Sequence, residues 1–255
     1  MRLDTSLTLL VNFIFGTLPW VTYTVFLLGI SLKLYTWFST APYHKTGSYS
    51  KTSISAGSVG LMIGQFIYLL LFQGRFIKPN IKSFVLWLMS FSAHISLFLI
   101  LFGHLRPIGV WSASWFAWVA SEQFLTRDLP FYLGWVVLGG FSLLLVRRVV
   151  DRSVRSISGF DDYFLLVILI IVFLAGNMMR VSPYIHEPFA LEISPGIVMQ
   201  LKETPSLIWL AVHGIAAQIL IMYMPFSKLF HIIASPFTVL AYSIRHGRLY
   251  GGMKT

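Results

Sequence analysis

Long apolar stretches, separated by short polar segments, run along the whole chain. Six of them hold close to the roughly 20 apolar residues with which an α-helix crosses about 30 Å of hydrocarbon. They cover residues 7–38, 54–76, 84–104, 131–150, 162–181 and 206–230. Because a lone span must satisfy its own backbone hydrogen bonds, each is predicted to be helical. The pattern predicts an all-α integral membrane protein, a bundle of about six transmembrane helices in a single domain over residues 1–255.

Composition agrees with this class and narrows the chemistry. Of the 255 residues, 56% are hydrophobic and 11% are charged, whereas soluble domains carry about 25% charged residues. The chain has no cysteine, which excludes disulfides, cysteine-ligated iron–sulfur clusters, covalent c-type haem and zinc–thiolate sites. Any redox cofactor must be held by histidine, by methionine or non-covalently.

The formal charge of +10 is interpreted as a sign of topology and anionic lipid rather than of nucleic acid binding. The basic run RRVVDRSVR at residues 147–155 predicts a cytoplasmic loop, and both termini are then cytoplasmic, in a multi-pass protein of the cell (inner) membrane. The four prolines within residues 181–205 predict an irregular cap on the outer side.

Four histidines lie within apolar segments, two in each of two predicted helices. Ten residues separate His94 from His104, a rise of about 15 Å, and 18 separate His213 from His231, a rise of about 27 Å. In antiparallel helices, His104 should face His213 near the outer side and His94 should face His231 towards the inside. The rises differ, and helix tilt or a kink at Pro225 would absorb part of the difference.

Two facing histidine pairs are suited to axial ligation of two b-type haems, one above the other. Intramembrane histidines can also be buried hydrogen-bonding residues. Two other functions stay open: a haem-free transporter or proton-relay protein, and a structural anchor for a soluble partner. Pumps usually bury carboxylates, and no Asp or Glu lies deep within a predicted span.

The segment MPFSKLFHIIASPFTVL at residues 224–240 resembles the PFSRLxHIWSxP segment of the nitrate reductase gamma subunit family of membrane cytochromes b. The spacings within both histidine pairs and the basic loop followed by FDD at residues 160–162 also resemble that family. The resemblance covers about residues 84–248. An extra span before the first histidine helix, added to the five-helix core of the family, favours the branch with the membrane subunits of heterodisulfide reductase and of the sulfite-reduction-associated complex.

The resemblance implies a di-haem subunit of a respiratory complex, with its haem core at about residues 84–232. Such a subunit exchanges electrons between a membrane quinone, menaquinone or ubiquinone, and a cytoplasmic iron–sulfur subunit of heterodisulfide reductase-like type. The resemblance also implies other subunits of the membrane complex as partners. His94 and His231 would ligate the inner haem b, and His104 and His213 the outer one.

Quinone chemistry near the outer haem needs proton donors and acceptors. Arg106, Glu122 and Arg127 follow His104 in the sequence. In the family, a basic residue of the loop after the first histidine helix serves the quinone, which makes Arg127 the nearest basic candidate, with Glu122 close by. Arg106 is an alternative partner for a haem propionate, and each of the three is also interpretable as an ordinary interfacial charge.

Overall fold

The computed structural model describes residues 5–40, 56–71, 80–107, 109–117, 121, 123–181, 187, 189–201 and 204–250. Its long helices are α2 (Leu18–Thr40), α4 (Ile81–His104), α5 (Leu129–Val150), α7 (Phe160–Val181), α8 (Leu207–Tyr223) and α9 (His231–Tyr250). The shorter ones are α1 (Thr5–Asn12), α3 (Ala56–Leu71) and α6 (Arg152–Ser156). Phe13–Thr17 and Phe124–Asp128 are π-helical, and single 3-10 turns cover Ala113–Phe116, Met224–Phe226 and Lys228–Phe230.

Five helical segments in the described part of the chain are long and apolar enough to cross a membrane: Ser6–Ser39, Phe84–His104, Phe124–Val150, Phe160–Val181 and Leu207–Phe226. The all-α membrane class predicted from the sequence is therefore confirmed. The remaining predicted span, residues 54–76, contains α3, which has 16 residues. At about 1.5 Å per residue, the described part of that helix is shorter than a full crossing.

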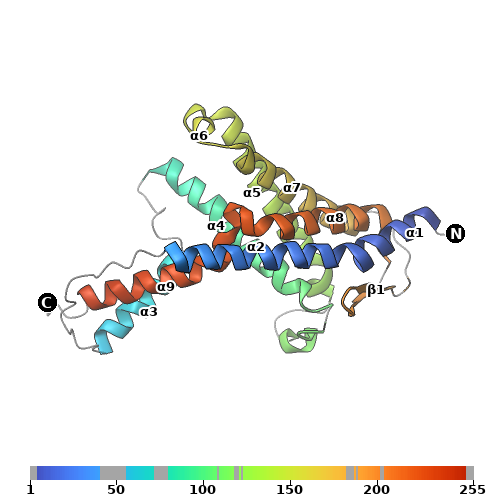
Figure 1. The fold of residues 1–255 in the computed structure, drawn as a ribbon, viewed down its shortest axis with the longest axis horizontal. Coiled ribbons are helices and arrows are strands. Elements are labelled where there is room, and N and C mark those ends of the chain that lie inside the picture. Colours follow the sequence, from blue (N-terminus) through green and yellow to red (C-terminus); the bar gives the residue numbers. More distant parts are fainter. Residues whose placement is uncertain are drawn as a thin grey trace. The chain divides into compact units, whose positions relative to one another are not determined.

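The chain forms two compact units, Met1–Ile30 with Ser92–Ser227, and Ser31–Phe91 with Lys228–Thr255. Helices α2 and α4 each contribute to both units. In the second unit, α3 packs along α9 (Figure 1). The prediction of a single transmembrane domain stays a prediction.

The core of the first unit lies between α5, α7 and α8, and α7 packs against both of the other helices (Figure 1). Val137 is fully buried there, and the rings of Phe141 and Phe173 are 6.0 Å apart. Gly134 of α5 lies directly against the side chain of Asn177 of α7. A side chain at residue 134 would collide with that amide, so this glycine permits the close approach of the two helices.

The N-terminal segment is attached to this core by hydrogen bonds to its π-helical turn. A π-helical turn departs from the α-helical hydrogen-bond pattern, and two of its carbonyls have tertiary partners. Gln218 Nε2 of α8 donates to the Ile14 carbonyl at 2.6 Å, and the Ser194 amide donates to the Phe15 carbonyl at 2.9 Å. The Thr22 hydroxyl donates to Gln218 Oε1 at 2.8 Å. These bonds fix the N-terminal helix against α8.

Residues 181–205 contain regular structure where the sequence predicted an irregular cap. Strands β1 (Phe189–Ile193) and β2 (Ile197–Leu201) form an antiparallel hairpin in which Ile193 pairs with Ile197. Gly196 in the turn has a φ of 88°, which glycine adopts without a steric cost. The prediction was wrong because Pro195 lies in the turn and Pro205 lies beyond β2, so neither interrupts the pairing.

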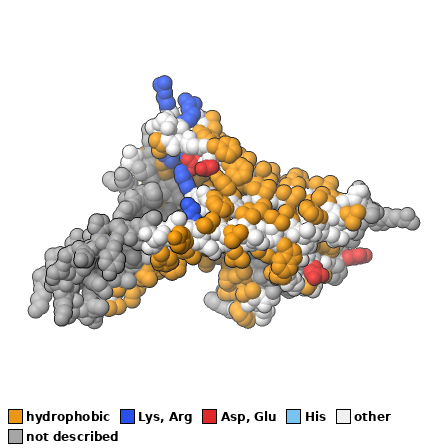
Figure 2. Space-filling model, in the orientation of Figure 1, with side chains coloured by type: hydrophobic (Ala, Val, Ile, Leu, Met, Phe, Trp, Pro, Cys, Tyr) orange, Lys and Arg blue, Asp and Glu red, His pale blue; other side chains and the backbone are white. Residues whose placement is uncertain are grey.

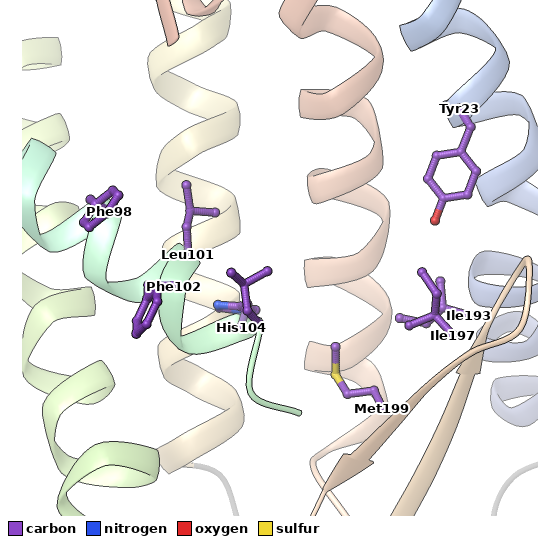
Figure 3. A pocket seen from close by; sticks show the side chains of 9 residues that line it. Tyr23, Phe98, Leu101, Phe102, His104, Ile193, Ile197 and Met199 are labelled. Atoms are coloured by element: carbon purple, nitrogen blue, oxygen red, sulfur yellow. The ribbon is translucent and has the colours of Figure 1, made fainter. Parts of the chain in front are cut away.

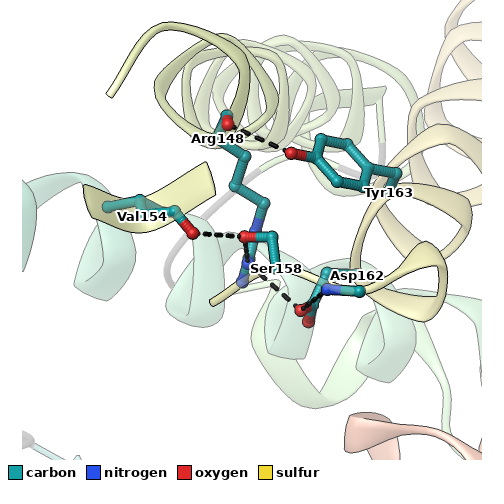
Figure 4. A network of polar contacts seen from close by, with 6 residues as sticks. Arg148, Val154, Ser158, Asp162 and Tyr163 are labelled. Carbon is teal, nitrogen blue, oxygen red and sulfur yellow. Dashed lines mark hydrogen bonds and ion pairs between the residues drawn. The ribbon is translucent and has the colours of Figure 1, made fainter. Parts of the chain in front are cut away.

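The α5–α6–α7 corner is fixed by a polar network around Arg148 (Figure 4). The guanidinium lies 3.3 Å from the carboxylate of buried Asp162 and donates to the Ser158 hydroxyl at 2.7 Å, while the Tyr163 hydroxyl donates to the Arg148 carbonyl. Three further arginines belong to this corner: Arg147 in the last turn of α5, and Arg152 and Arg155 in α6. Figure 2 shows Lys and Arg side chains gathered at the α6 end of the face.

Candidate functional site

Two of the four histidines that the sequence singled out meet in the first unit. His104 is the last residue of α4, and His213 lies in α8. Their ring centroids are 6.3 Å apart, and the ring planes are inclined by only 14°. The structure thus brings together the pair that the sequence predicted to face each other.

Each ring is oriented by a backbone carbonyl. His104 Nδ1 lies 2.7 Å from the Ile100 carbonyl oxygen, one turn earlier in α4. His213 Nδ1 lies 2.9 Å from the Val172 carbonyl oxygen of α7. Because a carbonyl only accepts hydrogen bonds, each Nδ1 carries the proton and donates. The tautomer of both rings is thereby set, and each Nε2 keeps its lone pair for a metal.

The separation of the rings matches two ligands on one metal ion. A metal–imidazole bond is about 2 Å long and the bonding nitrogen lies about 1 Å from its ring centre, so two axial imidazoles have ring centres about 6 Å apart. The observed 6.3 Å agrees with this value. A haem iron takes two such axial ligands, and the donor set present here therefore fits a bis-histidine haem.

A cavity of about 500 Å³ borders His104 (Figure 3). Its walls are mainly apolar side chains of α4 and of the β1–β2 hairpin, and Tyr23 of α2 closes one side. His104 is exposed although it ends a membrane-length helix, which is consistent with its lining this cavity. An apolar space beside an imidazole that has its Nε2 available as a ligand is suited to a porphyrin ring or a quinone.

Helix α7 contributes two further features to the site. A Cβ at Gly176 would lie 3.4 Å from Cε1 and Nδ1 of His213, so this glycine lets α7 approach the ring closely. One turn further, Arg180 donates from Nη1 to the Gly176 carbonyl at 2.8 Å and lies within electrostatic reach of both imidazoles. Arg180 could not be recognised from the sequence as part of the site, because a single arginine near the end of a span is common there.

The other two predicted ligands belong to different units of the chain. His94 is exposed on α4 in the first unit, and His231 begins α9 in the second, its Nδ1 2.6 Å from the Lys228 carbonyl oxygen. The inner pair therefore stays a prediction. Within the described residues, no three or more His, Asp or Glu side chains come together as a metal cluster.

Two of the three predicted quinone residues lie within the described part of the chain. Arg106 is half-buried in the turn that follows His104, and Arg127 is exposed in the π-helical turn before α5. Glu122 lies outside the described residues. Neither arginine lines the cavity beside His104, and the role of all three in quinone binding stays a prediction.

Membrane-length helices around two facing imidazoles define a multi-pass membrane protein with a candidate bis-histidine site. The model of the nitrate reductase gamma subunit family matches residues 80–248, well over half of the chain. The chain belongs to this family, as the histidine spacing and the PFSKLFH segment predicted.

Two relatives extend the comparison. The Hdr-like menaquinol oxidoreductase cytochrome b-like subunit of Archaeoglobus fulgidus is 25% identical over 264 residues, covering 87% of this chain and 77% of the relative. The respiratory nitrate reductase 2 gamma chain of Escherichia coli K12 is 25% identical over 177 residues, covering 61% of this chain and 74% of the relative. Because the archaeal match covers 87% of this chain, it includes residues before 80, which lie outside the match to the family model.

Proposed function

We propose that this chain is the membrane cytochrome b subunit of a quinone oxidoreductase and holds two b haems, each between two histidines. The observation that carries the proposal is the His104–His213 pair, with ring centroids 6.3 Å apart and both Nδ1 atoms held by carbonyls. The family and the names of both relatives support the same class. His94 and His231 are the proposed ligands of the second haem.

The protein's own contribution is to position the ligands. The Ile100 and Val172 carbonyls hold the proton on Nδ1 of each ring, and Gly176 leaves room for His213. The walls beside His104 are mainly apolar, which suits the flat apolar ring of a haem. A haem bound there supplies one-electron chemistry, and the fold sets its ligands and surroundings.

The two haems would connect opposite sides of the membrane. Quinone, menaquinone or ubiquinone, would exchange electrons near the outer haem, with Arg106, Glu122 and Arg127 as candidates for binding and proton transfer. Electrons would pass through the inner haem to a cytoplasmic iron–sulfur subunit of heterodisulfide reductase-like type. The basic corner around α6 and both termini would then lie in the cytoplasm, in accordance with the positive-inside rule.

The test is the number of haems per chain in single and paired alanine variants of the detergent-purified protein, measured from the pyridine haemochrome spectrum. Wild type should bind two haems. His104→Ala and His213→Ala should each remove one, and the double variant should remove no more than that one. His94→Ala combined with His104→Ala should remove both.

His44→Ala is the matched control, because His44 lies in a polar part of the sequence and should not affect haem content. Size-exclusion profiles and circular dichroism show whether each variant is folded. A folded wild-type protein that binds no haem would refute the proposal and restore the haem-free transporter alternative. Loss of different haems in His104→Ala and His213→Ala would refute the pairing.

A further inference from the structure

Arg180 lies near the end of a membrane-length helix, one turn beyond the glycine that borders the His213 ring. It is the last residue but one of α7 and is half-buried. Among the described residues, its guanidinium donates to the Gly176 carbonyl at 2.8 Å. Within the described part of the chain, no carboxylate forms an ion pair with Arg180. By contrast, Arg148 of α5 forms an ion pair with Asp162 at the opposite end of α7. A partly desolvated guanidinium is favoured by an anionic partner.

The surroundings of Arg180 define which anion would fit. Gly176, which accepts its hydrogen bond, lies in contact distance of the His213 ring, and the Arg180 charge acts on both His213 and His104. The guanidinium is therefore bonded to the residue that borders the His213 ring. Guanidinium groups bind carboxylates through parallel N–H···O bonds, which gives both energy and orientation.

We propose that Arg180 binds a propionate carboxylate of the haem held by His104 and His213, and thereby anchors that haem in one orientation. This inference rests on the proposed function. It assigns the propionate partner to α7, whereas the sequence had suggested Arg106 for this role.

A purely structural role is the competing explanation. Arg180 lies in the last turn of α7, where a cation interacts favourably with the helix dipole and donates to free carbonyls. Both roles predict that Arg180→Gln perturbs the protein. Only propionate binding predicts that the perturbation disappears when the carboxylates of the haem are blocked.

The experiment measures haem release to excess apomyoglobin from the absorbance change in the Soret region. It uses the His94→Ala background, which should hold the His104–His213 haem alone, loaded with either haem or haem dimethyl ester. In this background, Arg180→Gln should speed the release of haem about tenfold to hundredfold. Such a loss lies between the effects of breaking an exposed ion pair and of breaking a buried one. Release of the dimethyl ester should differ less than about twofold between the background protein and its Arg180→Gln variant, since no pair remains to be broken.

Arg180→Lys keeps the charge without the planar fork and should restore part of the retention. Arg155→Gln, which replaces an exposed arginine at α6, is the control and should release both cofactors like the background protein. Release of haem at an unchanged rate from the Arg180→Gln variant would overturn the inference, and so would equal acceleration with haem and its ester. A background protein without any haem would instead refute the proposed function.

Discussion

Gly214 fixes how closely the N-terminal segment packs against α8, and its replacement by alanine gives a direct test of that packing. A Cβ at residue 214 would lie 2.5 Å from Phe15 Cζ and 2.9 Å from Ile14 Cγ2. Carbon–carbon contacts are favourable only from about 3.5 Å. Ile14 is fully buried, and Phe15 is 8% exposed and borders a cavity of about 460 Å³, so a methyl group at residue 214 has to displace the Phe15 ring and press on Ile14. We predict that Gly214→Ala destabilises the protein.

The magnitude follows from two opposing terms. Overpacking of about 1 Å against a buried side chain costs about 1–3 kcal/mol. Alanine gains about 1 kcal/mol over glycine in a helix interior. The net expected loss is about 0–2 kcal/mol relative to the wild type, and about 1–3 kcal/mol relative to a glycine-to-alanine variant without the overlap. A chain of this size changes its midpoint by about 2–4 °C for each kcal/mol, so the midpoint of thermal unfolding should fall by up to about 8 °C relative to the wild type.

Gly103→Ala is the matched control. Gly103 directly precedes His104 as Gly214 directly follows His213, but a Cβ there would meet nothing within 4 Å. Its midpoint should stay unchanged or rise by the gain in helix propensity. Both midpoints are measured by circular dichroism in one detergent. A Gly214→Ala midpoint at or above that of Gly103→Ala would refute the packing of Ile14 and Phe15 against α8.

Two further predictions concern the polar end of the helix bundle. Asp162→Asn should destabilise the protein by about 1–3 kcal/mol, because it leaves Arg148 half-buried without its counter-charge; an unchanged thermal midpoint would contradict this. The pKa of Asp151 lies below its usual 3.8 because the Ser153 hydroxyl and the Val154 amide donate to the carboxylate. Its stabilisation of α6 should be complete above pH 3.8 and be lost as the pH falls through the lower folded-state value, which hydrogen exchange of the Val154 amide would reveal.

The membrane class and the facing histidines were predictable from the sequence because both depend on helical periodicity. A helical span has a fixed length in hydrocarbon, and antiparallel neighbours reverse the order of their residues. The placement of His104 opposite His213 needs only these two facts. The facing of His94 and His231 cannot be predicted in the same way. Between His213 and His231, the helix is interrupted by 3-10 turns at Met224–Phe226 and Lys228–Phe230. Sequence spacing does not specify the geometry of such an interruption.

The hairpin and the contacts of the N-terminal segment were not predictable. Their stability comes from tertiary hydrogen bonds, such as those of Ser194 and Gln218 to the carbonyls of the π-helical turn. Nothing in the local sequence identifies Gln218 as a partner of residues about 200 positions earlier. Similarly, glycine beside a histidine occurs at both Gly103 and Gly214, and only the structure shows that one of them is in close contact.

Helix α7 carries no histidine, yet it determines the geometry of the candidate site. Val172, Gly176 and Arg180 are spaced four residues apart, which places them along one side of the helix. The first fixes the tautomer of His213, the second admits its ring, and the third brings a positive charge to both imidazoles. A change that rotates α7 would disturb all three together. Substitutions along this side should therefore affect the His104–His213 site more than substitutions of equal size on the exposed side, for example at Val167 or Leu174.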